Sequence, residues 1–464
     1  MSPSAASHGT SFTKRGWLVC VWLLTTSLQY GYHISVLNQI QAVLTCKDTT
    51  TTPNDPPASG LGLPTCIPMS DFTFSAITAS FTIGGLMGSL IANLVMERYG
   101  RKGASRVSAG VMTVGAALMG TSGSITQIGL GRWLTGIASG IGLCVAPLYL
   151  AEIAPKKISG SVGVLNQLSV VFGLTLTQSL GLAFATPTTW RLVLFFSSAL
   201  SIAQLLTSFI ALESPAYLEE KRLDAERREV VAKLWGEPKR DAAEDDVEAP
   251  LVASQDGQDR ERQAVVSVWT ALTSPQLRLP LLIVSLAMSA QQLSGINAVM
   301  YYSNEILAKS LPDMGPYLSL GITIVNALMT FPPIILIEKL GRRPLLLISV
   351  SGAIISLLGV GYGLDGALRG LQTVGMLGFV MSFAIGLGPV PFVMISEVSP
   401  YHAVSALSSV ALSLNWTVNF FVGLTFLSLR NWLSGGDPLK EGRVFYLFAA
   451  VLGVSTVVML RLYK

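Results

Sequence analysis

Twelve long apolar segments divide this chain of 464 residues, and they constrain its fold more than any other feature. A helix needs about 20 residues to cross ~30 Å of hydrocarbon, and each segment is close to that length. The predicted spans cover residues 17–37, 72–96, 105–125, 128–150, 162–184, 192–212, 279–300, 317–337, 345–364, 371–395, 403–427 and 444–460. Short polar joins between them predict an all-α membrane protein with twelve transmembrane helices.

The composition agrees with a lipid environment. Half of the residues are apolar and only 12% are charged, whereas soluble proteins carry about 25% charged residues. Residues 213–262 hold 15 acidic and 9 basic side chains, so the acidic charge is concentrated in one polar segment. The remaining, membrane-embedded part is basic, which favours contact with anionic lipid headgroups. Nothing in the sequence resembles a nucleic-acid-binding module, and the oligomeric state is left open.

Basic residues flank the spans mainly on one side, which the positive-inside rule makes cytoplasmic. These residues are Lys14, Arg15, Arg98, Arg101, Lys102, Arg106, Lys156, Lys157, Lys339, Arg342, Arg343, Arg461 and Lys464. Both termini and the central loop are therefore predicted to be cytoplasmic. We expect a multi-pass protein of the plasma membrane, or of a vacuolar or other endomembrane. The first apolar segment is expected to be a retained span and not a signal peptide.

The chain repeats itself at two places. The string from Glu97 to Lys102 returns from Glu338 to Arg343, and the string Glu-x-x-Pro that starts at Glu152 returns at Glu397. The repeat predicts a tail (1–16), a six-helix bundle (17–212), a cytoplasmic loop (213–278) and a second six-helix bundle (279–464). Within the loop, residues 216–235 predict short amphipathic helices and residues 236–262 a disordered linker.

The repeated basic loops predict a gate. Arginine and carboxylate form directional, bidentate pairs that can hold one conformation and break in another. We expect arginines of these loops to meet nearby acids, although simple anchoring of the basic loops at the membrane surface would need no partner acid. The predicted gate residues are Glu97, Arg98, Arg101, Glu152, Glu213, Glu338, Arg342, Arg343 and Glu397.

Amide side chains inside the predicted spans indicate the kind of solute. Polar groups within a bilayer are costly and tend to face a cavity, and an amide both donates and accepts hydrogen bonds. Such groups suit a neutral solute rich in hydroxyls, whereas amides in other membrane proteins also join helices to one another. The amides in question are Gln167, Gln291, Gln292, Asn297, Asn326, Asn415 and Asn419.

Along essentially its whole length the chain resembles the sugar porter branch of the major facilitator superfamily. Six motifs carry the resemblance, and the seventh-span string from Gln291 to Tyr302 is the most specific. The others are Arg132-x-x-x-Gly136, Pro147-Leu-Tyr-Leu-Ala-Glu152, Glu213-Ser-Pro-Ala-Tyr-Leu218, Glu338-x-x-Gly-Arg-Arg343 and Asn415-Trp416. The resemblance implies transport of a hexose or similar neutral sugar by alternating access.

The resemblance also implies site residues and shows departures. It implies that Gln167, Gln291, Gln292, Asn297 and Asn326 hydrogen-bond the sugar, that Asn415, Trp416 and Phe392 line the site, and that Arg132 joins the gate. Family members often carry Glu and Trp where this chain has Ala384 and Phe392, which affects the expected substrate and affinity. The tenth-span string from Gly386 to Pro391 is expected to act as a hinge.

Energy coupling and the cysteines leave alternatives open. Without an acid well inside a span, facilitated diffusion is expected, although His33 could serve as a proton site in a proton-coupled sugar or polyol symporter. A transport-inactive sugar sensor is a further alternative. No pattern indicates an enzyme, a metal or a cofactor. Cys46 and Cys66 lie in the polar loop after the first span and could form a disulfide.

Overall fold

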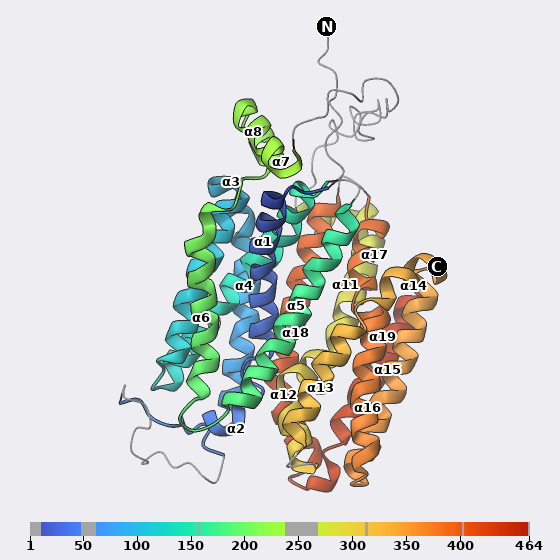
Figure 1. Cartoon of the computed structure of the whole chain (residues 1–464). Coiled ribbons are helices and arrows are strands. Elements are labelled where there is room, and N and C mark those ends of the chain that lie inside the picture. The colour runs from blue at the N-terminus through green and yellow to red at the C-terminus, as the bar shows by residue number, and fades with distance from the viewer. Residues whose placement is uncertain are drawn as a thin grey trace.

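The computed structural model is built from helices, as the sequence predicts (Figure 1). It describes residues 11–47, 62–155, 158–236, 268–310, 314–400 and 403–462. These segments contain no β-strand. The predicted linker at 236–262 lies, apart from its first residue, outside the described residues, as do Lys156, Lys157 and Lys464.

The first half of the chain forms mostly long helices. They are α1 (Lys14–Ser35), the single turn α2 (Gln41–Leu44), α3 (Asp71–Gly120), α4 (Ile125–Ile153), α5 (Ser159–Phe184) and α6 (Trp190–Leu206). Hydroxyl side chains start three of them: Thr13, Ser70 and Ser124 each accept a hydrogen bond from a backbone N–H of the first turn. The predicted amphipathic helices are α7 (Pro215–Glu220) and α8 (Asp224–Trp235).

The second half is interrupted more often. Its helices are α10 (Val268–Thr273), α11 (Arg278–Leu293), α12 (Ile296–Ser310), α13 (Gly315–Leu328), α14 (Pro332–Leu340), α15 (Arg342–Asp365), α16 (Arg369–Ser382), α17 (Val390–Val398), α18 (Val404–Ser434) and α19 (Arg443–Leu462). A π-helical turn, η4 (Phe383–Leu387), separates α16 from α17. The tenth span therefore departs from a regular α-helix where its glycines and prolines predict, because proline cannot supply the backbone donor that a regular helix needs.

Nine helical stretches in the described part of the chain are long and apolar enough to cross a membrane. The longest of them, Asp71–Gly120, contains two predicted spans, since Gly100 interrupts its helical backbone with φ 74°. The eighth predicted span is divided into α13 and α14, whose boundary falls at Pro332 and Pro333. The helices are consistent with the twelve spans that the sequence predicts.

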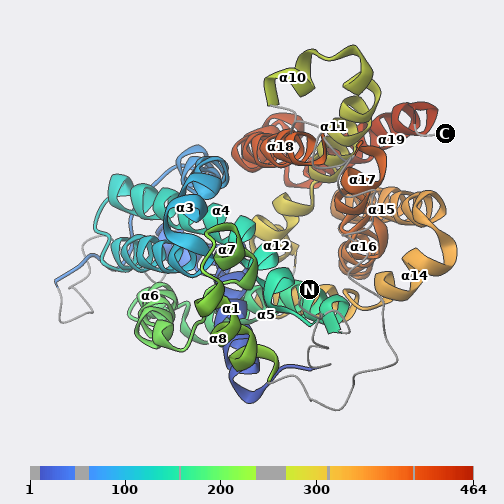
Figure 2. The same cartoon turned by 90° about the horizontal axis from the view of Figure 1, so that it is seen from above.

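The helices gather into two groups that lie side by side in Figure 2, with α1–α6 in one and α11–α19 in the other. The face that carries α7, α8 and the start of α1 is the predicted cytoplasmic face, and we call it the basic face (Figure 1). The opposite face carries α2, and we call it the disulfide face. The bundle boundaries at residues 17, 212 and 279 stay predictions.

Glycines let α3 and α4 pack backbone against backbone. A Cβ added at Gly84 or Gly88 would lie 2.1 Å from a carbonyl oxygen of α4, and one at Gly136 or Gly140 would lie 2.2 Å from a carbonyl oxygen of α3. Real Cβ atoms do not approach other atoms so closely, so any larger residue would force the two helices apart. The first group is therefore tightly joined.

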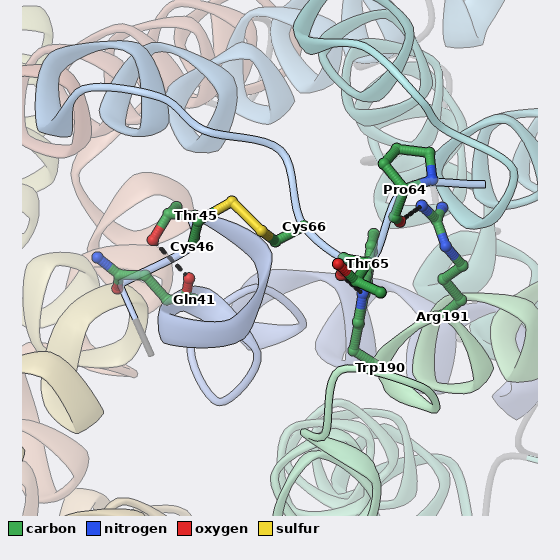
Figure 3. Close-up of a disulfide and its surroundings, with 8 residues drawn as sticks. All are labelled: Gln41, Thr45, Cys46, Pro64, Thr65, Cys66, Trp190 and Arg191. Carbon is green, nitrogen blue, oxygen red and sulfur yellow. Dashed lines mark hydrogen bonds between the residues drawn. A yellow bond between two sulfur atoms is a disulfide. The ribbon is translucent and has the colours of Figure 1, made fainter. Parts of the chain in front are cut away.

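The loop after the first span is fastened to this group at the disulfide face (Figure 3). Cys46 and Cys66 form a disulfide, as the sequence allows. Beside it, the Trp190 indole donates to the Thr65 carbonyl at 2.7 Å, and the Arg191 guanidinium donates to the Pro64 carbonyl at 2.7 Å. The disulfide and these bonds hold both sides of the loop to the ends of the helices.

Candidate functional site

A break in the seventh span places polar side chains in the middle of the structure. Helix α11 ends at Leu293 and α12 begins at Ile296, and Gly295 between them has φ 86°, which favours glycine. The Ser294 hydroxyl donates to the Gln291 carbonyl at 2.6 Å and so satisfies a group that the break would leave open. Discontinuous helices of this kind form binding sites in many transporters.

Four predicted amides meet at this break and form one hydrogen-bonded chain, which we call the amide cluster: Gln291, Gln292, Asn297 and Asn415. The Gln291 amide donates to carbonyls at the end of η4, Leu387 at 2.9 Å and Gly388 at 2.8 Å. Its oxygen accepts from Asn415 at 2.8 Å and from Gln292 at 3.4 Å. Asn297 donates to the Gln292 oxygen.

The amide cluster links three broken or polar segments of the second group. It joins the α11–α12 break to the π-helical turn of the tenth span and to α18. Each amide carries two N–H donors and an oxygen with two lone pairs, so these few bonds leave hydrogen-bonding capacity for a solute. A change in the conformation of the tenth-span turn would alter the hydrogen bonds of Gln291, because the carbonyls of that turn accept them.

The predicted Gln167 and Asn326 lie apart from the amide cluster. Gln167 on α5 is exposed and Asn326 on α13 is half-buried, and within the described residues neither side chain forms a hydrogen bond to the cluster. Farther along the same side of α5, Val171 and Gln178 are each only 1% exposed. That side of α5 is thus closed toward the disulfide face and open toward the basic face.

Trp416 bridges the two groups. It lies on α18, yet its indole N–H donates to the Ser89 hydroxyl on α3 at 3.1 Å. Its ring packs edge-on against Tyr30 and Phe81 of the first group, and a Cβ at Gly85 would lie 2.6 Å from it. Phe392, predicted to line the site with it, is 47% exposed on α17, and none of the ring contacts in the described part of the chain involves it.

At the basic face, Arg101 meets the acids that the sequence pairs with it. Its guanidinium donates to Glu152 through Nε at 3.0 Å and Nη2 at 2.8 Å, which is a bidentate geometry. The positive φ of Gly100 turns the chain so that the backbone N–H groups of Arg101 and Lys102 donate to Glu213 at 2.9 and 3.2 Å. Burial raises the pKa of the Glu213 carboxyl, while these backbone donors oppose that shift.

The second group repeats this arrangement with less burial. Arg342 donates from Nε to Glu397 at 2.7 Å, again beside a glycine of positive φ, Gly341. The side chains of this pair are 36% and 33% exposed, against 15% and 12% for Arg101 and Glu152. Each ion pair lies within a single helix group, Arg101–Glu152 in the first and Arg342–Glu397 in the second. Neither pair therefore crosses the mouth of the predicted path.

Other predicted gate residues are not in these networks. Glu97, Arg98 and Arg343 are exposed and form no ion pair with another described residue. The side chain of Glu338 lies outside the described part of the structure. Arg132 is fully buried inside the first group, where it donates to the His33 carbonyl and lies 4.3 Å from the Phe81 ring. It therefore packs the bundle interior and does not join the basic-face network.

His33, the predicted proton site, is buried in the same place. Its Nε2 is 2.6 Å from the Ser197 hydroxyl on α6, and its ring is fully enclosed. The imidazole lies between helices of the first group, away from the amide cluster of the second. A role in the predicted path would require it to act across the interior of its own bundle.

Sequence reasoning missed the contacts that close the disulfide face. Asn38, just after α1, donates to the hydroxyls of Ser303 at 2.8 Å and Ser319 at 3.0 Å. Gln39 donates to the Pro316 carbonyl at 2.9 Å, and Ser319 donates to Gln178 at 3.5 Å. These bonds join the first group to α12 and α13. Asn38 and Gln39, two polar residues at the end of the first predicted span, were the sequence signal for these contacts.

These features define a solute transporter of the major facilitator fold. They are two groups of membrane helices, a broken span lined by amides, and a basic loop that occurs once in each half. The comparisons with known proteins agree. A family model described as "Sugar (and other) transporter" matches residues 19–464, and the chain belongs to this family. It is therefore a sugar-porter-type transporter and not an enzyme.

Relatives of known description cover nearly all of the chain. A probable metabolite transport protein of Saccharomyces cerevisiae is 32% identical, over 97% of this chain and 93% of its own length. Facilitated glucose transporter member 4 of solute carrier family 2 from Mus musculus is 33% identical, over 92% and 83%. The partially occluded inward open xylose transporter XylE from E. coli has a TM-score of 0.72 at 20% identity, covering 97% and 99%.

Proposed function

We propose that this protein carries a hexose or a similar neutral sugar across the membrane by alternating access, as facilitated diffusion. Relatives described as facilitated glucose transporters support the sugar, since they are 30–33% identical to this chain. The observation that carries the proposal is the amide cluster at the seventh-span break. Amides without a neighbouring charge favour hydroxyls over ions or amino acids.

The substrate would bind beside this cluster, between bundles 17–212 and 279–464. We assign direct sugar contacts to Gln292, Asn297 and Asn415, and a supporting role to Gln291, whose donors already hold the tenth-span turn. Gln167 would complete the site from the first group, and Asn326 and Trp416 would complete it from α13 and α18 of the second group. Phe392 would reach it only after a rearrangement of α17.

The contacts of the two faces support a path that opens alternately. Within the described residues, hydrogen bonds between the two groups lie at the disulfide face and at Trp416, while the ion pairs of the basic face stay within each group. This state is closed toward the disulfide face. The opposite state would break those bonds and bring the basic loops of the two groups together.

The disulfide supports the proposed orientation in the membrane. Disulfides persist in oxidising compartments, so the face with Cys46 and Cys66 would lie outside the cell or in a lumen. The basic face and both termini would then be cytoplasmic, as the flanking arginines and lysines predict. We propose the plasma membrane as the site of action.

Uptake of labelled sugars by proteoliposomes tests this function. A panel of hexoses, pentoses and inositol is offered with and without a pH gradient. We expect one or more hexoses to equilibrate at the same initial rate in both conditions. Uptake that rises with an inward proton gradient and falls with an uncoupler would establish symport instead. Correctly folded protein without flux of any sugar would contradict transport and favour a sensor.

A further inference from the structure

A buried arginine joins the two bundles at the disulfide face. Arg430 near the end of α18 is only 2% exposed, and its Nη2 donates to Glu305 of α12 at 2.9 Å. Glu305 entered no sequence prediction, because the seventh span was expected to end at residue 300, whereas α12 continues to Ser310. The pair itself lies within the second bundle.

From this pair, two separate connections cross to the first bundle. Gln41 of α2 donates to the other oxygen of the Glu305 carboxylate. On the opposite side, Arg430 donates to the Asn431 side-chain oxygen from Nε at 3.3 Å and Nη2 at 3.2 Å. The Asn431 amide then donates to Asp71 at the start of α3 at 3.4 Å. Arg430 therefore holds Glu305 and Asn431, the two side chains of this cluster that contact the first bundle.

The first bundle ties Gln41 and Asp71 to neighbouring residues by further contacts. Lys47 pairs with Asp71 at 2.5 Å, and it directly follows Cys46 of the disulfide. The Ile67 backbone N–H donates to the Leu44 carbonyl at 2.8 Å, which ties α2 to the loop beside Cys66. Figure 3 shows Gln41 and Thr45 on the turn that leads into the disulfide. These contacts fix the positions of Gln41 and Asp71 within the first bundle.

We propose that Gln41, Asp71, Glu305, Arg430 and Asn431 form a charged lock that holds the disulfide face closed and that must open before sugar can enter from that side. The lock is separate from the Asn38–Ser303–Ser319 contacts, and it rests on the proposed alternating access. Opening leaves Glu305 paired with Arg430 but breaks the two crossing hydrogen bonds, Gln41 to Glu305 and Asn431 to Asp71, so the closed state is stabilised by bonds that the open state lacks. The lock therefore shifts the conformational equilibrium of the sugar-free protein toward the state that is open at the basic face.

The variants that test the lock leave the buried ion pair in place. Gln41→Leu removes one crossing and Asn431→Ala removes the other, and neither strands Arg430 or Glu305 without its partner. Thr45→Val is the matched control, since the buried Thr45 hydroxyl donates only to the Gln41 carbonyl of its own turn, at 2.8 Å. All variants are made in a Cys144→Ser background with Asn297→Cys as the probe position.

The readout is the rate at which a membrane-impermeant maleimide labels the probe from each face. Along α12 the probe lies eight residues from Glu305, or about 12 Å toward the centre. We expect each lock variant to label about threefold to tenfold faster from the disulfide face and more slowly from the basic face, with a larger effect in the double variant. Thr45→Val should label like the parent.

Equal labelling of the parent and both lock variants would overturn the proposal. Faster labelling from both faces would also overturn it, because that result indicates a loosened fold and not a shifted equilibrium. The labelling requires no sugar, so it separates the lock from the proposed function. If sugar flux is absent but labelling shifts as expected, the substrate assignment fails and the lock stands.

Discussion

At the scale of single residues, the same side-chain type serves two purposes in this protein. Gln204 is buried in the first bundle, where its amide donates to Thr26 and accepts from Gln29, both at 2.8 Å. Gln292 is buried as well, but its partners are the other amides at a helix break. Burial alone therefore does not separate an amide that joins helices from one that faces a solute.

Replacing each glutamine by leucine distinguishes the two roles. Gln292→Leu should raise the KM for sugar about tenfold to a hundredfold, because one or more hydrogen bonds to the solute are lost. Gln204→Leu should lower thermal stability and leave KM within about twofold of the parent value, since its bonds lie inside one bundle. Initial uptake rates at graded sugar concentrations provide both KM values. A normal KM in Gln292→Leu would contradict the site.

The two loop glycines make a second matched pair at this scale. Gly100 and Gly341 both combine positive φ with ψ near 180°, a region essentially reserved for glycine, so alanine at either costs about 1–3 kcal/mol in backbone strain. At Gly100 the new Cβ would also lie 2.3 Å from a Glu213 oxygen, whereas at Gly341 no atom lies within 4 Å.

We therefore expect Gly100→Ala to destabilise the protein by about 1–3 kcal/mol more than Gly341→Ala, because only the first disturbs the Glu213 contacts. Thermal unfolding in detergent gives the comparison. Equal losses of stability in the two variants would show that the carboxylate moves aside freely.

At the scale of elements, apolar length and backbone-breaking residues were predictable, but contact partners were not. The tenth-span break follows from local chemistry at Gly386 and Pro391, and the amphipathic α7 and α8 follow from residue spacing. The end of the seventh span was misjudged, because α12 continues past residue 300 to Ser310 through polar residues that packing and an ion pair satisfy. Contacts such as Asn38 with Ser303 join residues 265 positions apart, and periodicity carries no information about them.

The disulfide gives a prediction for the element that it fastens. The double variant Cys46→Ala, Cys66→Ala frees a loop that spans 20 residues in sequence, and loop entropy predicts a loss of about 3 kcal/mol. Cys144→Ala serves as the control, since Cys144 is a free, half-buried thiol. Melting temperatures in detergent measure the difference. An unchanged melting temperature in the double variant would mean that Trp190 and Arg191 suffice to hold the loop.

At the scale of the whole molecule, the arrangement favours movement down a gradient. The acid that the structure adds to a membrane-spanning helix, Glu305, is engaged by Arg430 and Gln41 near the disulfide face. His33 is enclosed within one bundle beside Ser197. Neither residue is hydrogen-bonded to the amide cluster, and neither is placed to contact a sugar bound there.

A His33→Asn variant should accordingly transport like the parent from about pH 5 to 8, because asparagine keeps a polar partner for Ser197 but cannot titrate in this range. Initial uptake rates in proteoliposomes over that pH range make the comparison, with an uncoupler added in parallel. Loss of a pH-stimulated, uncoupler-sensitive component in the variant would establish His33 as a proton carrier.

The backbone contact of α3 with α4 has a mechanical consequence. No side chain lies between α3 and α4 where they touch, at Gly84, Gly88, Gly136 and Gly140. The two helices therefore cannot slide or tilt against each other without a steric clash. The first half of the protein should then behave as a stiff frame, while deformation concentrates in the second half, where three spans are interrupted. The transport cycle would be asymmetric, because the second bundle would bend while the first keeps its shape.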